Sequence, residues 1–243
     1  MRSLLRTQAV ALGVAAGLGL AGLAASQSLE EMGKPNLAAN WGDSSAKAVR
    51  PAAPNRTDIP WFQTLVDAAP PGSVLKPPPG DYAGPVLVDK PLTIDGDGGK
   101  VTIDGGGKGT VFVIDTKGAT LRGMHLKGSG ESHDSDDTCL NVRGDHHVIE
   151  GNVIDDCLFG IDLKQANHNV IRQNRISSKP FELGVRGDGL RLWYSNHNLI
   201  EKNEVTDSRD MVAWYANHNI YRDNIGKRSR YSIHFMFAKD SVV

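Results

Sequence analysis

The sequence lacks several features that would point to common protein classes. Its 27 basic and 28 acidic residues nearly cancel, so its charge gives no reason to expect binding to nucleic acid or to an anionic membrane surface. It has only two cysteines, Cys139 and Cys157, three places out of register in neighbouring repeats. They permit a disulfide without requiring one. A pair of small buried thiols is an equal alternative, and a metal role ranks third.

Long hydrophobic runs are also scarce, and the one that stands out is N-terminal. Arg2 and Arg6 precede an apolar stretch, residues 9–25, which is followed by small residues. The stretch is short for a membrane span, so it predicts a secretory signal peptide over residues 1–26 rather than an uncleaved anchor. Residues 27–60 are rich in Pro, Ala, Ser and Asn, lack periodicity, and predict a flexible linker. The mature protein is therefore expected outside the cytosol.

What the sequence does have is repetition. The segments DHHVIEGN, NHNVIRQN, NHNLIEKN and NHNIYRDN begin at residues 145, 167, 196 and 217. A second set, FGIDLK, DGLRLW, DMVAWY and YSIHFM, begins at residues 159, 188, 210 and 231. Two strand-like runs in each period of about 22 residues, with no helical pattern between them, indicate a solenoid of β-coils. We therefore predict an all-β fold, a parallel β-helix over residues 61–243.

A short helix is expected over residues 61–69, before the first coil. Phe62, Leu65, Val66 and Ala69 follow the i, i+3, i+4, i+7 pattern of one helical face, and a Pro-Pro-Gly sequence ends it. Such a helix would cap the open edge of the first coil.

Alternation along the strands predicts which side chains face inward and which stack in columns. The predicted core pairs are Leu140/Val142, Ile161/Leu163, Leu190/Leu192, Val212/Trp214 and Ile233/Phe235, joined by Val148, Val170, Leu199 and Ile220 of the other run. Asn152, Asn174, Asn203 and Asn224 are expected to form a hydrogen-bonded ladder at one turn. Residues 128–137 and 177–187 are expected to be paired loops at one corner.

Several motifs resemble one family. Residues 69–114 and 118–130, the segment RGDGLRLW (186–193) and the segment RYSIHFMFAKDS (230–241) resemble the NosD-type accessory proteins of nitrous oxide reductase maturation. The likeness covers nearly everything after residue 61. Its most specific parts are the final Arg-Tyr-x-Ile-His-x-Met-x-x-x-Asp motif and Trp193 after a Gly-x-x-Leu strand.

The resemblance implies a right-handed parallel β-helix in the periplasm with no enzymatic activity. It implies docking on an ABC-type transporter, both ATPase and permease, and contact with nitrous oxide reductase and a copper chaperone. The protein would supply copper, bound only transiently, and would meet the membrane only through its partners. The chain departs from the family in its His-rich turns and its early end, so residues 61–243 are expected to be a C-terminally incomplete β-helix.

The outward positions of the second run carry the residues that fit this role. Two outward columns are predicted, Asn141–Asp162–Arg191–Ala213–His234 and Arg143–Lys164–Trp193–Tyr215–Met236. The predicted partner-binding residues are Trp193, Tyr215, Arg191, Arg209 and Arg230. His234 and Met236 lie two apart on one strand, and an imidazole with a thioether suits Cu(I), so they are the candidate copper ligands. A docking Met beside a hydrogen-bonded His is the alternative.

Two further groups of residues leave alternatives open. His146, His168, His197 and His218 fall in one register; a metal-binding column is conceivable, but polar turn residues are the favoured interpretation. Asp136, Asp155, Asp156 and Asp162 would be the acidic site of a secreted polysaccharide lyase, epimerase or hydrolase, or a solvated loop. A solenoid acting only as a binding platform is the third hypothesis.

Overall fold

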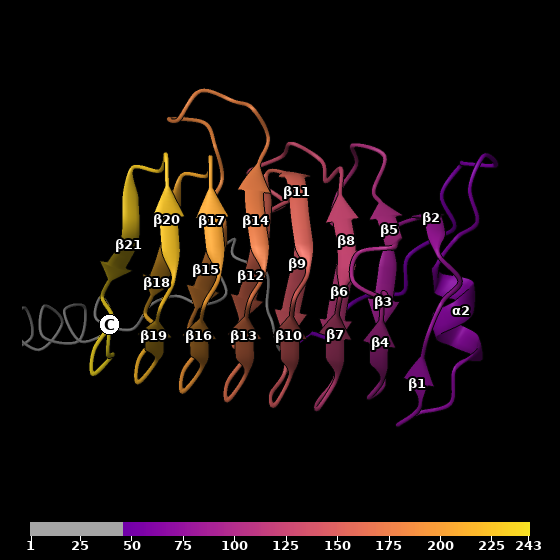
Figure 1. Ribbon diagram of the computed structural model, residues 1–243, viewed down its shortest axis with the longest axis horizontal. Helices are drawn as coiled ribbons and strands as arrows, with labels where there is room; N and C mark the ends of the chain where they lie inside the picture. Colours follow the sequence, from indigo (N-terminus) through magenta and orange to yellow (C-terminus); the bar gives the residue numbers. More distant parts are fainter. Residues whose placement is uncertain (1–45) are drawn as a thin grey trace, which may run out of the picture. The chain divides into compact units, whose positions relative to one another are not determined.

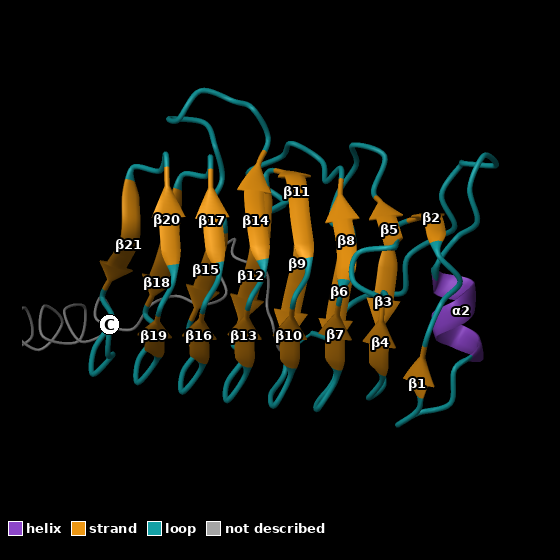
Figure 2. Ribbon diagram, in the orientation of Figure 1, coloured by secondary structure: helices purple, strands orange, loops and turns teal. Residues whose placement is uncertain are grey.

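A computed structural model describes residues 46–243, which form one compact unit. This unit is a parallel β-helix in which strands and the turns between them repeat along a single axis (Figure 1 and Figure 2). The predicted signal peptide and the first part of the predicted linker lie outside the described residues. Within residues 46–243, no helix combines the length and apolar character needed to cross a membrane.

Each coil contributes one strand to each of three seven-stranded sheets, so neighbours in a sheet are three strands apart in the sequence. The first sheet contains β1 (Val74–Leu75), β4 (Thr93–Asp95), β7 (Thr120–Arg122), β10 (Val148–Glu150), β13 (Val170–Arg172), β16 (Leu199–Glu201) and β19 (Ile220–Arg222). The second contains β2 (Gly80–Ala83), β5 (Val101–Asp104), β8 (Met124–Lys127), β11 (Val153–Cys157), β14 (Arg175–Ser178), β17 (Glu204–Thr206) and β20 (Ile225–Lys227). The third contains β3 (Val86–Val88), β6 (Phe112–Asp115), β9 (Thr138–Arg143), β12 (Phe159–Lys164), β15 (Leu190–Trp193), β18 (Asp210–Trp214) and β21 (Tyr231–Met236).

The predicted parallel β-helix is confirmed, but the coil has three strands where the sequence suggested two. The strands that the repeat analysis missed are those of the second sheet, such as β14 and β17. They are short, and each has a single buried apolar side chain among polar residues, Ile176 in β14 and Val205 in β17. One buried apolar residue per strand is too little alternation to be recognised from sequence.

Helix α2 (Gln63–Ala68) lies beside β1 and β2 at one end of the solenoid (Figure 1). Phe62 and Val66 are fully buried there, and the Phe62 ring meets the Tyr82 ring edge-on at 5.3 Å. The Gln63 amide donates to the carbonyl of Leu87 at 2.9 Å and accepts from its N–H at 2.6 Å. A side chain thus takes the hydrogen bonds that a preceding strand would make with β3.

Residues 46–60, the described part of the predicted linker, contain no regular element but contact the solenoid. Arg143 donates to the carbonyl of Ala46 at 3.1 Å, and Arg50 forms an ion pair with Asp67. Residues 46–60 therefore belong to the same compact unit as the solenoid.

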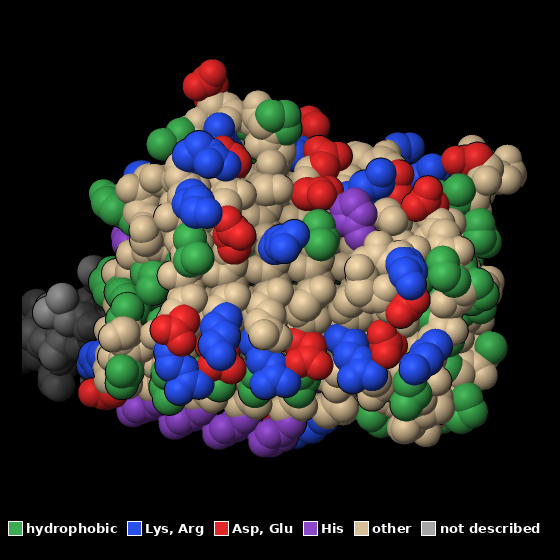
Figure 3. All heavy atoms as spheres, in the orientation of Figure 1, with side chains coloured by type: hydrophobic (Ala, Val, Ile, Leu, Met, Phe, Trp, Pro, Cys, Tyr) green, Lys and Arg blue, Asp and Glu red, His purple; other side chains and the backbone are tan. Residues whose placement is uncertain are grey.

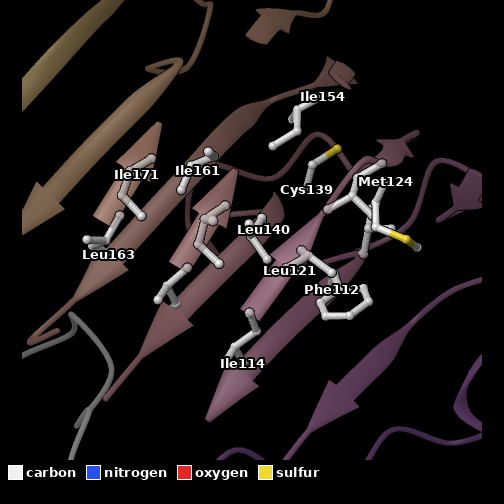
Figure 4. Packing of buried hydrophobic residues seen from close by; sticks show 14 of the residues in the cluster. Phe112, Ile114, Leu121, Met124, Cys139, Leu140, Ile154, Ile161, Leu163 and Ile171 are labelled. Carbon is white, nitrogen blue, oxygen red and sulfur yellow. The ribbon is translucent and has the colours of Figure 1, made fainter. Parts of the chain in front are cut away.

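The core consists of columns of like residues stacked from coil to coil. Leu140 pairs with Ile161, and Leu163 pairs with Leu192, as predicted; Figure 4 shows several of these side chains directed into the solenoid. In the first sheet the prediction was wrong by one position. The buried column is Ile149–Ile171–Ile200–Tyr221, while Val148, Val170, Leu199 and Ile220 point outward. The polar turn residue just before each of these strands, His147 in one coil and Asn in the other three, is itself buried, so alternation sends the next residue out.

Two asparagine ladders run along the turns. The predicted ladder is confirmed: Asn152 donates to Asn174, Asn174 to Asn203 and Asn203 to Asn224, at 2.9–3.0 Å. A second ladder joins Asn169, Asn198 and Asn219, at 3.0–3.1 Å. Side-chain amides of both ladders also donate to backbone carbonyls, so buried turn groups are satisfied in the coils that the ladders join. Of the alternatives for the cysteines, the structure has the disulfide, Cys139–Cys157, between β9 and β11.

Candidate functional site

The outer face of the third sheet carries most of the residues that the sequence nominated. Strand pairing puts Asp162, Arg191, Val212 and His234 in one column on β12, β15, β18 and β21. The next outward column is Lys164, Trp193, Trp214 and Met236. Because parallel strands pair in register, each column presents its side chains on the same side of the sheet.

The two predicted outward columns are wrong in the coil that contains β18. Ala213 faces inward, between Leu192 and Phe235, and Trp214 faces outward. The segment before the turn is one residue shorter in this coil: DGLRLWYSNHN in the preceding coil corresponds to DMVAWYANHN. Alignment on the Asp gives the wrong register, whereas alignment on the shared Trp-Tyr-x-Asn-His-Asn gives the observed one.

An aromatic ridge results from this register, and we define it as Trp193, Tyr194, Trp214, Tyr215, Met236 and Phe237. Trp193 and Trp214 meet edge-to-face, with ring centroids 4.7 Å apart. Tyr215 stacks between Tyr194 and Phe237, 4.9 Å from each. The prediction placed Tyr215 in the Trp193 column; it lies one position later, in the turn, with Trp214 in its place. The sequence analysis missed Tyr194, Trp214 and Phe237, which the Trp-Tyr alignment would have found.

A buried ion network lies beside the ridge. Asp162 is fully buried and accepts two hydrogen bonds from Arg191, at 2.9 and 2.8 Å. Asp136 completes the network, 2.9 Å from the Arg191 guanidinium and 2.8 Å from the Lys164 ammonium. Burial disfavours ionisation of Asp162, but Arg191 and Lys164 outweigh it and hold the pKa of this carboxyl below its usual value. The Arg191 guanidinium also covers the Phe159 ring at 4.3 Å.

The four predicted acidic residues do not converge on one site. Asp136 and Asp162 belong to the third-sheet network, whereas Asp155 and Asp156 lie on β11 in the second sheet. There Asp155 is 3.0 Å from His125, and Asp156 is 3.3 Å from Lys179. Each of the four carboxylates therefore has a basic partner. Two of them lie at the third sheet and two lie on the second sheet.

A further carboxyl, Asp188, was not predicted. Burial raises its pKa to about 6, against the opposing effect of Arg191 and Arg209. The fully buried Asp210 nearby is paired with Arg230 and lies 3.4 Å from Nδ1 of His234.

The candidate copper ligands, His234 and Met236, lie on one side of β21, opposite Val212 and Trp214. Both side chains are partly buried. Nδ1 of His234 contacts Asp210 and Arg230, so Nε2 is the nitrogen that would bind a metal. Within residues 46–243, no three His, Cys, Asp or Glu side chains form a group suited to a metal ion.

The two predicted loops meet each other. Nε2 of His133, in the first loop, lies 3.0 Å from the carbonyl of Val185 in the second. The His133 ring also contacts the Phe159 ring at 5.5 Å, edge-on. The loops therefore lie next to the Arg191 network, where the strands of the third sheet begin. The turn residues of the aromatic ridge follow the other ends of these strands.

Known proteins resemble the chain at two levels. A family model described as a right-handed beta-helix region matches residues 109–242. The chain is 29% identical over 134 residues to the "Probable ABC transporter binding protein NosD" of Pseudomonas aeruginosa, covering 54% of this chain and 31% of that protein. The chain thus spans less than a third of that relative's length.

Solved structures give a weaker likeness. An alginate lyase from Paenibacillus sp. str. FPU-7 has a TM-score of 0.47 at 15% identity, covering 68% of this chain and 72% of the lyase. The Escherichia coli protein YbhC has a TM-score of 0.46 at 12% identity, covering 84% and 80%. With both TM-scores below 0.5, neither likeness carries an argument about function.

Proposed function

The chain belongs to the family of right-handed β-helix proteins, and on that footing we propose that it is a periplasmic accessory protein for the maturation of nitrous oxide reductase. In this role it docks on an ABC-type transporter and takes part in copper supply, without catalysing a reaction itself. The similarity to a protein named as a probable ABC transporter binding protein supports this assignment.

The observation that carries the proposal is the aromatic ridge on the outer face of the third sheet. Trp and Tyr side chains are enriched at the centres of protein interfaces, where they bury large areas at a small cost in conformational entropy. Trp193, Trp214 and Tyr215 hold each other in fixed orientations, so the surface is ordered before a partner arrives. Such preorganisation favours docking.

The arginines divide between two roles. Arg209 and Arg230 precede β18 and β21, and their backbones are hydrogen-bonded to each other at 2.9 Å. They would form the polar rim of the docking surface. Arg191 is only 6% exposed and its guanidinium is held by Asp136 and Asp162, so it stabilises the face from within rather than contacting a partner.

Copper would pass through His234 and Met236. Imidazole nitrogen and thioether sulfur are suited to Cu(I), and two ligands bind it weakly enough to release it to a partner. Anaerobic titration with Cu(I) against a chromogenic chelator tests this step. We expect weak binding by the wild-type chain, loss of binding in the variant His234→Ala/Met236→Ala, and retention in the control variant His133→Ala, whose imidazole contacts the carbonyl of Val185 in the loops. Unchanged binding in the double variant would remove the handover role.

A second candidate is a secreted polysaccharide lyase, epimerase or hydrolase, and the raised pKa of Asp188 is the observation that favours it. A carboxyl with a pKa of about 6 can donate and accept protons near neutral pH. Under this alternative the chain turns over uronate or neutral glycans, and Asp188→Asn and Asp162→Ala abolish the turnover. Absence of turnover across a broad glycan panel would dismiss it.

A further inference from the structure

A second group of side chains lies in the turn that leads from the third sheet into the first, three residues after Tyr194 and Tyr215 of the aromatic ridge. We define the histidine column as His146, His168, His197 and His218. Their rings stack with centroids 5.3, 5.0 and 4.9 Å apart and planes within 14° of parallel. Figure 3 shows histidine side chains in a row along the lower edge of the molecule, open to solvent.

The fold does not need imidazoles at these four positions. Each residue has a positive φ, between 56° and 62°, a conformation that Asn adopts more readily than most residues. The backbone N–H of His168 bonds the carbonyl of Asn196, and the other three make the equivalent bond to the next coil. Within residues 46–243, no hydrogen bond involves an imidazole nitrogen of the column. The four exposed imidazoles therefore contact one another by stacking, and their nitrogens take no part in the hydrogen bonds that hold the turns.

We propose that the histidine column is a row of surface sites for borderline divalent metal ions such as Zn²⁺, Ni²⁺ and Cu²⁺, each ion held by two neighbouring imidazoles. Neutral imidazole is a preferred ligand of these ions. Nitrogens that share one ion lie about 3 Å apart, because each metal–nitrogen bond is about 2.0–2.1 Å. Rotation of two exposed side chains on adjacent coils brings them to that separation from a ring spacing of about 5 Å.

The arrangement also sets the number of ions and their lability. Four imidazoles in a line form two separate neighbouring pairs, His146 with His168 and His197 with His218, so the full column holds two ions. Since no group of three or more His, Cys, Asp or Glu suited to a metal is present within residues 46–243, water fills the other coordination positions. The ions exchange readily, and Mg²⁺ and Ca²⁺, which prefer oxygen ligands, do not compete.

Two double variants, each of which keeps two histidines of the column, distinguish two kinds of binding. In one kind two neighbouring imidazoles hold an ion together, and in the other each imidazole binds an ion by itself. His146→Asn/His168→Asn leaves His197 and His218 as neighbours. His168→Asn/His218→Asn leaves His146 and His197, two coils or roughly 10 Å apart, which cannot share an ion. Asn at a positive φ preserves the turn, and matched melting temperatures check that both variants fold.

The measurement is calorimetric titration of the untagged chain with Zn²⁺. We expect two ions per chain in the wild type and one ion with unchanged affinity in the variant that keeps neighbours. In the variant that separates them, affinity falls by about 100-fold, because the second ligand is no longer held close to the first. Equal affinities in the two variants, or no Zn²⁺ binding by the wild type, would overturn the proposal.

Discussion

Leu192 of β15 pairs with Ala213 of β18, and this single pairing turns Trp214 outward, against Trp193. Small Ala213 fills the narrow place between Leu192 and Phe235, while the large indole of Trp214 extends the aromatic ridge. The inside and the outside of this coil are therefore set by one residue of register.

The register can be tested by introducing a lysine at an inward-facing position and, separately, at an outward-facing position of β18. Ala213 is fully buried, so Ala213→Lys is expected to lower the free energy of unfolding by more than about 4 kcal/mol. Trp214→Lys loses ring contacts on the outer face and is expected to cost about 2 kcal/mol. Urea denaturation measures both, and equal losses, or a larger loss at Trp214, would contradict the observed register.

The buried asparagine ladder predicts a strong effect at Asn203. Its amide accepts from Asn174 at 2.9 Å and donates to the carbonyl of Ile171 at 2.9 Å. Asn203→Ala leaves these groups buried without partners and is expected to cost about 3 kcal/mol. Asn217, partly exposed in the neighbouring turn, accepts from the Lys239 N–H, and Asn217→Ala is the matched control with a cost below about 1 kcal/mol. Chemical denaturation that finds the two variants alike would refute the ladder's role.

Removal of only one partner of the buried Asp162–Arg191 pair is expected to lower the free energy of unfolding. Arg191→Met leaves the Asp162 carboxylate buried with Lys164 at 3.6 Å as its remaining basic neighbour, and is expected to cost about 3–5 kcal/mol. Adding Asp162→Asn removes the buried charge and should restore part of the loss. Arg228→Met breaks an exposed pair with Asp207, which solvent screens, and should cost far less than Arg191→Met.

The same network predicts a dependence on acid. Arg191 and Lys164 hold the pKa of Asp162 in the folded protein below its ordinary value of 3.8, against the opposing effect of burial, so its contribution to stability is complete above pH 3.8 and is lost as pH falls through the folded value. Asp162→Asn should lack this component in melts at decreasing pH. A variant with the full wild-type acid dependence would show that other carboxyls are responsible.

His147 predicts a separate loss of stability at a higher pH. Its imidazole is 1% exposed, accepts from the Ala119 N–H at 3.0 Å and donates to the Arg143 carbonyl at 2.9 Å. Burial, against the opposing effect of these hydrogen bonds, lowers the pKa of His147 below 6.5, so stability is complete above pH 6.5 and declines as pH falls below it.

The matched variant is His147→Asn, because the next coil has Asn169 at this position and Asn does not titrate. The stability of the wild type relative to the variant should fall as pH is lowered from about 7.5 to about 5, because only the wild type must keep a buried imidazole neutral. A constant difference across this range would contradict the assignment of a neutral buried imidazole.

The sequence predicted those parts of the fold that repeat. The Asn ladder and the pairing of Leu163 with Leu192 follow from side chains that recur in each coil, since in-register stacking requires like residues at like positions. Strands β14 and β17 of the second sheet were missed because a single buried apolar side chain per strand leaves no alternation to recognise. Val170 was assigned to the core because the burial of Asn169, an amide in the interior, was not anticipated.

The candidate site was predictable only in part. Trp193, Met236 and His234 were placed correctly on one outer face, because alternation within a strand fixes them relative to each other. Whether Arg191 was free or buried depended on Asp136, which reaches it from an inserted loop. No repeat pattern describes the path of such a loop.

The most direct test of the account is the affinity of the purified chain for a detergent-solubilised ABC-type transporter, its ATPase and permease together. The variant Trp193→Ala/Trp214→Ala is expected to bind at least about tenfold more weakly than wild type, because aromatic anchors dominate such interfaces. Val170→Ala/Leu199→Ala, which changes the outer face of the first sheet, is expected to bind as wild type does. Unchanged affinity on loss of both tryptophans, with the fold intact, would contradict the proposal that the aromatic ridge is the docking surface.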